Sequence, residues 1–568
     1  AVCLTHPCPA SAQMDMSGHT METRDETPPD RLPVPQRMTG IGNVHMRITA
    51  TPEAQMWFNQ GLNLLHDFWD YESARAFEQS VRVDPHCAMC YWGLYAAESF
   101  YHSNAQGYAR QALTMASSLE HHASKRERLY IEATAAHQNA PQLWHKLVRK
   151  YPKDTEARIF LSRVVDHKES VALLQSVLKD DPDNSAANHY YIHALEWTDH
   201  PEQALHSAEI LPSLAPASGH MVHMPGHIFF RLGDYARAGQ SFAASMQVDE
   251  RYMREQHVQP DNDWNYVHNL MYAVANLMEE GKLKEATALS TKLTGARGEL
   301  ESTLYIYSSR DSISRLDPRL PVALRTANWA QVIELLHASP PPAERPNLDF
   351  LSRQLISFAA GMQAVEAHNL SKAEELSTQL DSALSQMSRP AKDSPKTQTM
   401  GANNVPGVGM PKLQVMPDAL LQPLLKTLSI LSLELRACLL TAQGKIPEAK
   451  ALFTQAEHQQ EALGYREPPS YIRPVGEAEG AAMISLGHWA DARAAYQQAL
   501  RDRPRSGFAL YGIAICTEKS GDLPAAAKQY AAFLTAWKNA DPDLPQLMHA
   551  QTCVARHPPS AEGQNRVD

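Results

Sequence analysis

The chain has 568 residues, of which 43% are hydrophobic, and it carries a net charge of −11 with an isoelectric point near 6.2. This composition can bury a core, but the length exceeds one compact domain and fits a stacked repeat array. Because the charge is acidic we expect no nucleic-acid partner, and because no run of eighteen apolar residues occurs we expect no membrane span.

Residues 1–52 are polar, rich in Pro, Met and Thr, and have no helical period, so we predict an extended N-terminal arm. The opening AVCLTHPCPASAQ lacks Met and ends in small residues. We interpret it as a processed terminus or the end of an export signal, and expect a periplasmic or extracellular protein; an arbitrary start of the sequence is the alternative. Within the arm, Met14, Met16, His19 and Met21 could hold copper, or could simply belong to a solvated leader.

The seven cysteines fit an oxidising compartment only in part. Cys3 with Cys8, and Cys87 with Cys90, are close in sequence and are predicted to form disulfides. The alternative for the C-A-M-C motif is a redox pair, but no βαβ pattern surrounds it. An odd total leaves at least one thiol over or one bridge between chains.

A repeat begins at Pro52, where seven residues fall on one tetratricopeptide register: Trp57, Gly61, Leu64, Ser73, Phe77, Ser80 and Pro85. Further along, Pro182, Pro216 and Glu250 are spaced by 34 residues (216 − 182 = 34 and 250 − 216 = 34), the length of one helix–turn–helix unit. Similar matches recur at Gly444, Gly487 and Gly521. We therefore predict an all-α fold, a tetratricopeptide-repeat α-solenoid that forms a right-handed superhelix of helix–turn–helix pairs.

The domain organisation follows from where this pattern holds. We predict, in chain order, an N-terminal array with a histidine-rich groove, divergent helical repeats, a Pro/Gly-rich loop, a C-terminal array and a polar tail, at residues 53–300, 301–386, 387–418, 419–556 and 557–568. An insertion in the N-terminal array, REQHVQPDNDWNY, is predicted to form a loop over one face.

Six histidines and a glutamate lie in three successive predicted helices: His189, His193, Glu196, His220, His223, His227 and His268. In tetratricopeptide units the second, fifth, ninth and twelfth places of the first helix face the concave groove. On the 34-residue register His189 and His223 take fifth places, and counting back from Gly281 puts His268 in a second place. We expect all seven side chains to converge. The neighbours His121 and His122 point apart and are expected to be solvated.

Residues three or four apart share a helix face, so two imidazoles can reach one ion at about 2.0–2.1 Å while a neighbouring helix supplies further ligands. The site is predicted to bind copper or zinc, and Met221, Met224 and Met271 favour copper. A histidine pKa near 6.5 predicts loss of metal between about pH 7 and 5.

Three alternatives stay open. The groove histidines could bind a peptide or protein without metal, or copies could associate head to tail into a filament. A metalloenzyme with Glu196 as general base ranks last, because no HExxH motif or nucleophile elbow occurs.

The segments NHYYIHALE, GHMVHMPGHIFFRLGDY and YVHNL resemble a family of exported bacterial tetratricopeptide proteins of poorly defined function, with HYYIH and GHxxHMPxHI motifs. The resemblance covers most of residues 40–290 and, more loosely, 465–515. It implies the fold and export but no activity.

Overall fold

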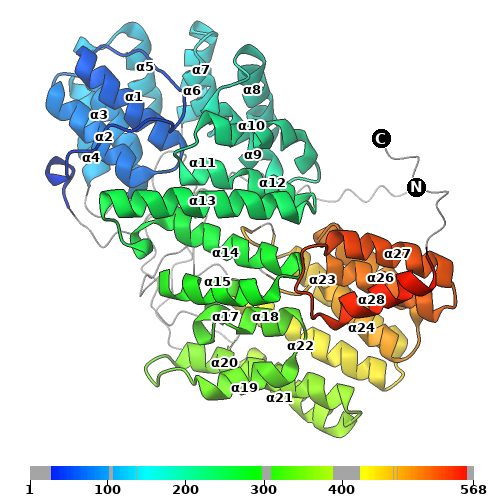
Figure 1. The fold of residues 1–568 in the computed structure, drawn as a ribbon. Helices are drawn as coiled ribbons and strands as arrows, with labels where there is room; N and C mark the ends of the chain where they lie inside the picture. Colours follow the sequence, from blue (N-terminus) through cyan, green and yellow to red (C-terminus); the bar gives the residue numbers. More distant parts are fainter. Residues whose placement is uncertain are drawn as a thin grey trace, which may run out of the picture.

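A computed structural model describes residues 27–101, 107–136, 139–296, 309–387, 422–464, 466–469 and 471–558. Within these ranges every regular element is a helix, and no strand occurs. Each helix packs mainly against its neighbours in the chain, so the helices form a continuous stack of pairs (Figure 1). The predicted all-α solenoid is confirmed.

The first part of the stack, blue to green in Figure 1, ends with the long helices α13 to α15. Its helices are α1 Pro52–His66, α2 Asp70–Val83, α3 Ala88–Tyr101, α4 Tyr108–Ser118, α5 Lys125–Ala135, α6 Ala140–Lys150, α7 Thr155–Ser162, α8 His167–Asp180, α9 Ser185–Glu196, α10 Leu205–Leu214, α11 Gly219–His223, α12 Pro225–Arg231, α13 Tyr235–Gln256, α14 Trp264–Glu279 and α15 Leu283–Ala296.

The second part runs from green to red and has its own hydrophobic core. Its helices are α17 Ser309–Leu316, α18 Leu320–Arg325, α19 Trp329–Ala338, α20 Pro346–Glu366, α21 Leu370–Met387, α22 Gln422–Ala442, α23 Ile446–Glu461, α24 Val475–Ser485, α25 Trp489–Asp502, α26 Gly507–Lys519, α27 Leu523–Ala536 and α28 Pro545–Arg556.

Glycines in the first helix of a pair make room for an aromatic ring from the second. The ring of Phe77 on α2 is fully buried, and a Cβ atom at Gly61 or Gly93 would lie 2.9 or 2.2 Å from it. The same relation holds for Phe242 and Gly226, where the distance would be 2.3 Å. These close approaches explain why the repeat pattern alternates small and aromatic residues.

The predicted insertion does not form a loop over one face. Instead α13 continues to Gln256 and is followed by only a short connection with a 3-10 turn at Pro260–Asn262 before α14 begins. The additional residues lengthen the helix because little in them ends it before His257, which has a left-handed backbone with φ 57°.

The last helices lie beside the end of α14 and the turn that leads into α15 (Figure 1). The Trp537 indole Nε1 donates to the Glu279 carbonyl at 2.8 Å, and the Asp541 amide donates to the Gly281 carbonyl at 3.1 Å. The C-terminal end of the described solenoid is thus tied to its middle.

The described part of the N-terminal arm packs along α1 and has no regular secondary structure apart from a 3-10 turn at Pro29–Arg31. Asn63 on α1 donates to the Val44 carbonyl and accepts from the Val44 amide, both at 2.9 Å. Asn43 accepts at 3.0 Å from the Ser185 amide at the start of α9. The arm therefore connects two helices that are far apart in the sequence.

Other predicted features lie outside the described residues. These are the soft-ligand cluster of the arm, the Cys3–Cys8 pair, the loop at 387–418 apart from Met387, and most of the tail at 557–568.

Candidate metal centre

The seven predicted metal-ligating residues lie on α9, on α11 with α12, and on α14. Each of these is the first helix of a helix–turn–helix pair, and the three pairs follow one another in the chain. Each begins with a capping side chain, because Asn184, Ser218 and Asp263 accept hydrogen bonds from the backbone amide three residues on. The caps start the helices at equivalent places.

His189, His223 and His268 are therefore each the fifth residue of their helices. The predicted second place for His268 is wrong, because α14 begins at Trp264, three residues earlier than the register counted from Gly281 requires. The equivalence puts these three rings at one level of neighbouring helices.

Pro225 divides what would be one helix into α11 and α12. The Met224 amide still donates to the His220 carbonyl at 3.0 Å, but a proline has no amide hydrogen with which to continue the pattern. This break between the two helices lies between His223 and His227, whose Nε2 atoms lie 2.6 Å apart.

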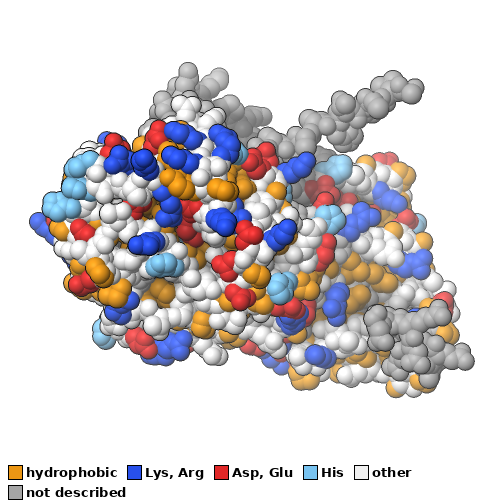
Figure 2. Space-filling model, turned by 90° about the horizontal axis from the view of Figure 1, so that it is seen from above, with side chains coloured by type: hydrophobic (Ala, Val, Ile, Leu, Met, Phe, Trp, Pro, Cys, Tyr) orange, Lys and Arg blue, Asp and Glu red, His pale blue; other side chains and the backbone are white. Residues whose placement is uncertain are grey.

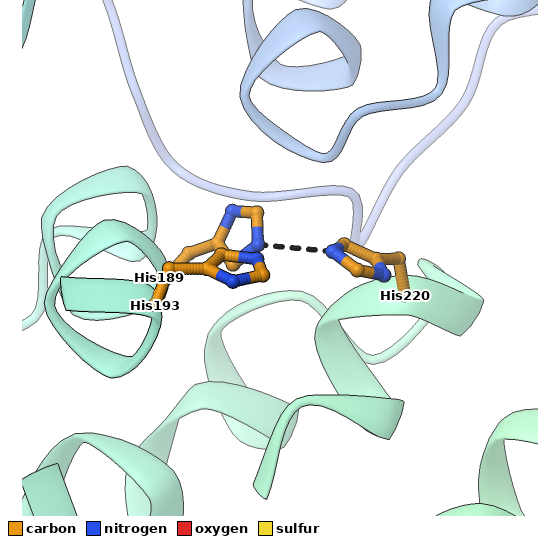
Figure 3. A group of neighbouring side chains, drawn as sticks. All are labelled: His189, His193 and His220. Carbon is orange, nitrogen blue, oxygen red and sulfur yellow. Dashed lines mark hydrogen bonds between the residues drawn. The ribbon is translucent and has the colours of Figure 1, made fainter. Parts of the chain in front are cut away.

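The first group of converging nitrogens comes from His189 and His193 on α9 and His220 on α11 (Figure 3). One ring nitrogen from each lies within 4.8 Å of the other two. The Nε2 atoms of His189 and His220 face each other at 3.1 Å.

The second group consists of His223, His227 and His268, with one ring nitrogen from each again within 4.8 Å of the others. All six predicted histidines are thus brought together, in two groups of three.

Hydrogen bonds on the outer side of the rings fix the tautomers of His220 and His223. The Nδ1 atom of His220 lies 3.1 Å from Asn265 Oδ1, and that of His223 lies 2.6 Å from Asn269 Oδ1. Both amides are oriented by their own donations, to Asp249 and to the Phe242 carbonyl. Carboxamide oxygens only accept, so Nδ1 carries the proton and Nε2 presents a lone pair inward.

The same applies to three more rings. His189 Nδ1 donates to the His66 carbonyl at 2.6 Å, and His193 Nδ1 donates to Glu196 Oε1 at 2.7 Å. His227 Nδ1 donates to the other oxygen, Oε2, of the same glutamate. Glu196 therefore links the two groups from behind the rings, the position that orienting carboxylates occupy around metal-bound histidines.

Glu467 enters the cluster from the segment between α23 and α24. Its Oε2 atom lies 3.6 Å from His268 Nε2 and 3.8 Å from His227 Nδ1. With His193 and Glu196 it forms another set of possible ligand atoms within 4.8 Å. Burial, and then the charge of Glu196, raise the pKa of Glu467 well above its usual value.

Burial also keeps two of the imidazoles, those of His193 and His223, neutral. It lowers the pKa of His193 to about 4, against a smaller opposite effect of Glu467, and the pKa of His223 to about 3. Neutral rings are the form that binds metal.

The cluster is enclosed rather than open to solvent. The seven predicted residues have exposed fractions between 0 and 4%. The ring of Phe68 lies 4.7 Å from that of His189, and Trp264 lies 5.0 Å from His220. The histidines therefore do not line an open concave groove as predicted, and a peptide could not reach them.

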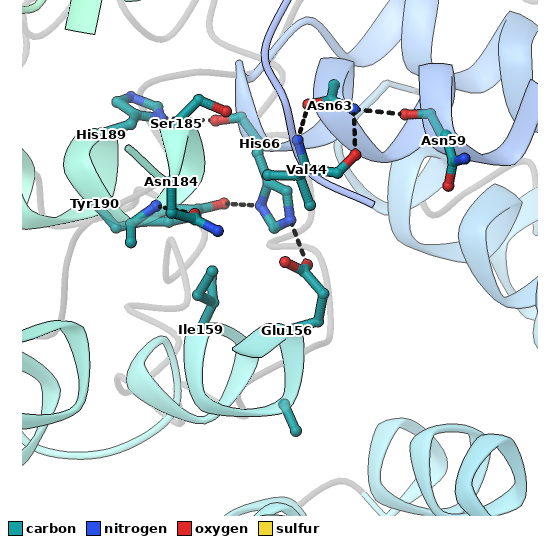
Figure 4. A network of polar contacts seen from close by, with 12 residues as sticks. Val44, Asn59, Asn63, His66, Glu156, Ile159, Asn184, Ser185, His189 and Tyr190 are labelled. Carbon is teal, nitrogen blue, oxygen red and sulfur yellow. Dashed lines mark hydrogen bonds and ion pairs between the residues drawn. The ribbon is translucent and has the colours of Figure 1, made fainter. Parts of the chain in front are cut away.

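A neighbouring buried histidine, His66, shows a different arrangement (Figure 4). Its Nε2 atom lies 2.8 Å from Glu156 Oε2 and its Nδ1 atom 3.2 Å from the Tyr190 hydroxyl. Both ring nitrogens are thus bound to protein oxygens, as expected for a structural histidine.

Sequence reasoning missed several members of this site. Asn265 and Asn269 lie on α14, one before and one after His268 in the sequence. Their spacing of four residues could have identified them. Glu467 follows α23 and has no local pattern that connects it with the histidines.

Cys87 and Cys90 are joined by a disulfide, while Cys438, Cys516 and Cys553 are free. The methionines Met221 and Met224 lie in the main hydrophobic core, and Met271 lies in a smaller one. His121 and His122 are exposed, as expected, but their ring centroids lie 4.0 Å apart, so the prediction that the two side chains point apart is wrong.

Acidic and basic side chains are interspersed on the molecular face in Figure 2. Among the helices of the described ranges, none combines the length and hydrophobicity that crossing a bilayer requires.

Residues 478–541 match the tetratricopeptide repeat family. No curated protein is significantly similar to the chain in sequence.

Similar solved structures include yeast Tom70, with 11% identity, a TM-score of 0.31, and coverage of 89% of this chain and 96% of that one. Human IFIT1 bound to m7Gppp-AAAA has 12% identity, a TM-score of 0.31, and coverage of 79% and 90%. Cut9, in its complex with Hcn1, has 11% identity, a TM-score of 0.27, and coverage of 76% and 84%.

The family match and the stacked helical pairs lead to the same assignment. The chain has the fold of a tetratricopeptide-repeat α-solenoid, and residues 478–541 within it match the tetratricopeptide repeat family.

Proposed function

We propose that this tetratricopeptide-repeat protein binds transition-metal ions, copper or zinc, in the enclosed centre made by the six histidines and Glu196. Two pairs of facing ring nitrogens give the strongest support: His189 with His220 at 3.1 Å, and His223 with His227 at 2.6 Å.

In each pair both rings donate from Nδ1 to an oxygen, so that neutral rings direct two lone pairs at each other. Such an approach is favourable only with a cation between the nitrogens. A proton would require an imidazolium in an interior that lowers the pKa of His223 to about 3. A metal ion binds both lone pairs without charging a ring.

The spacing is compatible with coordination. An ion about 2.0–2.1 Å from two nitrogens at a tetrahedral angle holds them about 3.3 Å apart. The first pair is close to this value, and the second would have to widen. Three histidines in each group, with Glu196 and Glu467 nearby, provide ligands for two ions.

Two further parts of the proposal concern compartment and partners. The Cys87–Cys90 disulfide supports an oxidising, exported location. Because the histidines are enclosed, a protein partner or head-to-tail association of copies would use the outer surfaces of the solenoid.

The test is elemental analysis of protein isolated from its source, combined with zinc and copper titration of chelator-treated protein. We expect His189→Ala and His223→Ala each to lose bound metal relative to the unmutated chain. The exposed His121→Ala variant is the control and should bind like the unmutated protein. Equal binding by all four proteins would contradict the proposal.

A further inference from the structure

The last helices of the solenoid carry another cluster of metal-ligating side chains. Glu518 lies at the end of α26, and His549 and Cys553 lie one turn apart on α28. One ligand atom from each lies within 4.8 Å of the other two. None of these helices carries any of the six histidines, so the two clusters share no residue.

The three atoms form a nearly regular triangle. His549 Nε2 lies 3.3 Å from Glu518 Oε2 and 3.5 Å from Cys553 Sγ, and the sulfur lies 3.6 Å from the carboxylate oxygen. Zinc bonds of about 2.0 Å to oxygen, 2.05 Å to nitrogen and 2.3 Å to sulfur, at tetrahedral angles, give separations of about 3.3, 3.55 and 3.5 Å in the same order. The side chains therefore already have the spacing of three ligands around one ion.

A nucleophilic cysteine would need another arrangement. In a cysteine–histidine–acid triad the thiol and the carboxylate contact opposite nitrogens of the ring. Here Cys553 and Glu518 both approach Nε2 of His549, and Nδ1 lies 2.9 Å from the Tyr511 hydroxyl. Convergence on one nitrogen is typical of coordination rather than of proton relay.

The surroundings orient two of the ligands. Tyr530 donates to Glu518 Oε2 at 2.7 Å, and the Tyr511 oxygen can accept from His549 Nδ1. The His549 side chain is 35% exposed, which leaves room for water as a fourth ligand.

We propose that Glu518, His549 and Cys553 bind a zinc ion that fastens α28 to α26 across α27 at the C-terminal end of the solenoid. The cysteine loses its proton when it binds the metal. This site stands independently of the six-histidine centre.

Cobalt(II) titration of the chelator-treated full-length protein tests the site, because a thiolate ligand gives a near-ultraviolet charge-transfer band that histidine and carboxylate ligands do not. We expect the band to saturate as cobalt is added and to be displaced by zinc. It should disappear in Cys553→Ser and His549→Ala. It should remain in Cys516→Ser, a buried cysteine on α26 outside the triangle, and in His223→Ala, which alters only the six-histidine centre.

The absence of the band from the unmutated protein, or its persistence in Cys553→Ser, would overturn the proposal. A second measurement needs no variant: alkylation of Cys553, followed by peptide mass analysis, should slow roughly tenfold or more when zinc is added. An unchanged alkylation rate would show a hydrogen-bonded cluster without metal.

Discussion

The Arg325 guanidinium donates from Nη1 to the Glu477 carboxylate, 152 residues further along the chain, and both side chains are buried. Glu279, at the end of α14, accepts from the same guanidinium at 3.1 Å. Burial alone would lower the pKa of Arg325, yet the two carboxylates raise it, and Arg325 in turn lowers the pKa of Glu279. This network joins the two halves of the solenoid.

Replacing this arginine by methionine removes the shared cation of two buried carboxylates and leaves Glu279 with only the more distant Arg503, 3.8 Å away. We expect Arg325→Met to destabilise the protein by about 3–5 kcal/mol, measured as a lower midpoint of the first thermal transition. Arg353→Met is the control, because Arg353 and Asp349 are 65% and 46% exposed in their ion pair and such pairs contribute at most about 1 kcal/mol. Equal midpoints for the two variants would contradict a structural role of the network.

Glu196 accepts hydrogen bonds from both His193 and His227, which yields a prediction for metal binding. In Glu196→Gln an NH2 group replaces one of the two carboxylate oxygens, and this group cannot accept a hydrogen bond from a histidine Nδ1. The histidine that faces it must therefore carry its proton on Nε2 instead. We expect metal affinity to fall about 10- to 100-fold in titrations.

The matched control is Glu156→Gln. Glu156 is also buried and also binds a histidine, but its partner is His66, whose two ring nitrogens contact protein oxygens. Metal affinity should not change. If both variants lost affinity equally, Glu196 would act through general stability rather than by orienting ligands.

The lowered pKa values of His193 and His223 make one contribution to the pH dependence of stability. In metal-free protein the unfolded chain takes up protons near pH 6.5, while the folded chain resists protonation until about pH 4 and 3. The contribution of these two histidines to the free energy of unfolding should be constant above pH 6.5 and fall as pH decreases towards these values, by on the order of 3 kcal/mol for His193 alone.

Denaturant unfolding at several pH values with a chelator present measures this dependence. His193→Gln should show a weaker decline than the unmutated protein, and His121→Ala the same decline. Metal should also remain bound at pH 5, below the range expected from a free histidine, because burial opposes ring protonation. A decline that starts only below pH 4 would contradict the assigned shifts.

Gly226 and Gly295 both lie in helices but differ in the space around them. A Cβ atom at Gly226 would lie 2.3 Å from the Phe242 ring, whereas nothing lies within 4 Å of one at Gly295. Gly226→Ala should therefore destabilise by about 1–3 kcal/mol and weaken metal binding, since Phe242 packs 5.1 Å from the His223 ring. Gly295→Ala should be neutral or stabilising by up to about 1 kcal/mol. Circular dichroism melting and metal titration would compare them.

The fold could be predicted because each repeat depends on local signals. Gly61 and Phe77 already show in the sequence which helices approach closely, and the 34-residue spacing places helix starts that the caps Asn184 and Ser218 then fix. The repeat spacing predicted the wrong helix position for His268, because an insertion lengthened α13 and shifted the start of α14.

The candidate site was predictable for the histidines but not for what surrounds them. His189 and His223 share a register, so their convergence follows from stacking. Glu467 reaches them only because the C-terminal part of the chain folds back onto α14, a contact between distant segments that no period encodes. The burial of the histidines also depends on contacts between distant segments of the chain. The expectation of an exposed groove was therefore wrong.

The enclosure of the six histidines also sets how fast a bound ion could exchange. Phe68, Trp264 and the segment that carries Glu467 surround the rings, so an ion could leave only when these parts separate. Residence time would then be set by the opening rate of the protein and not by the strength of the coordination bonds. A chelator added to loaded protein would remove this metal at a rate independent of its own concentration, and metal acquired while the chain folds would stay in place long afterwards.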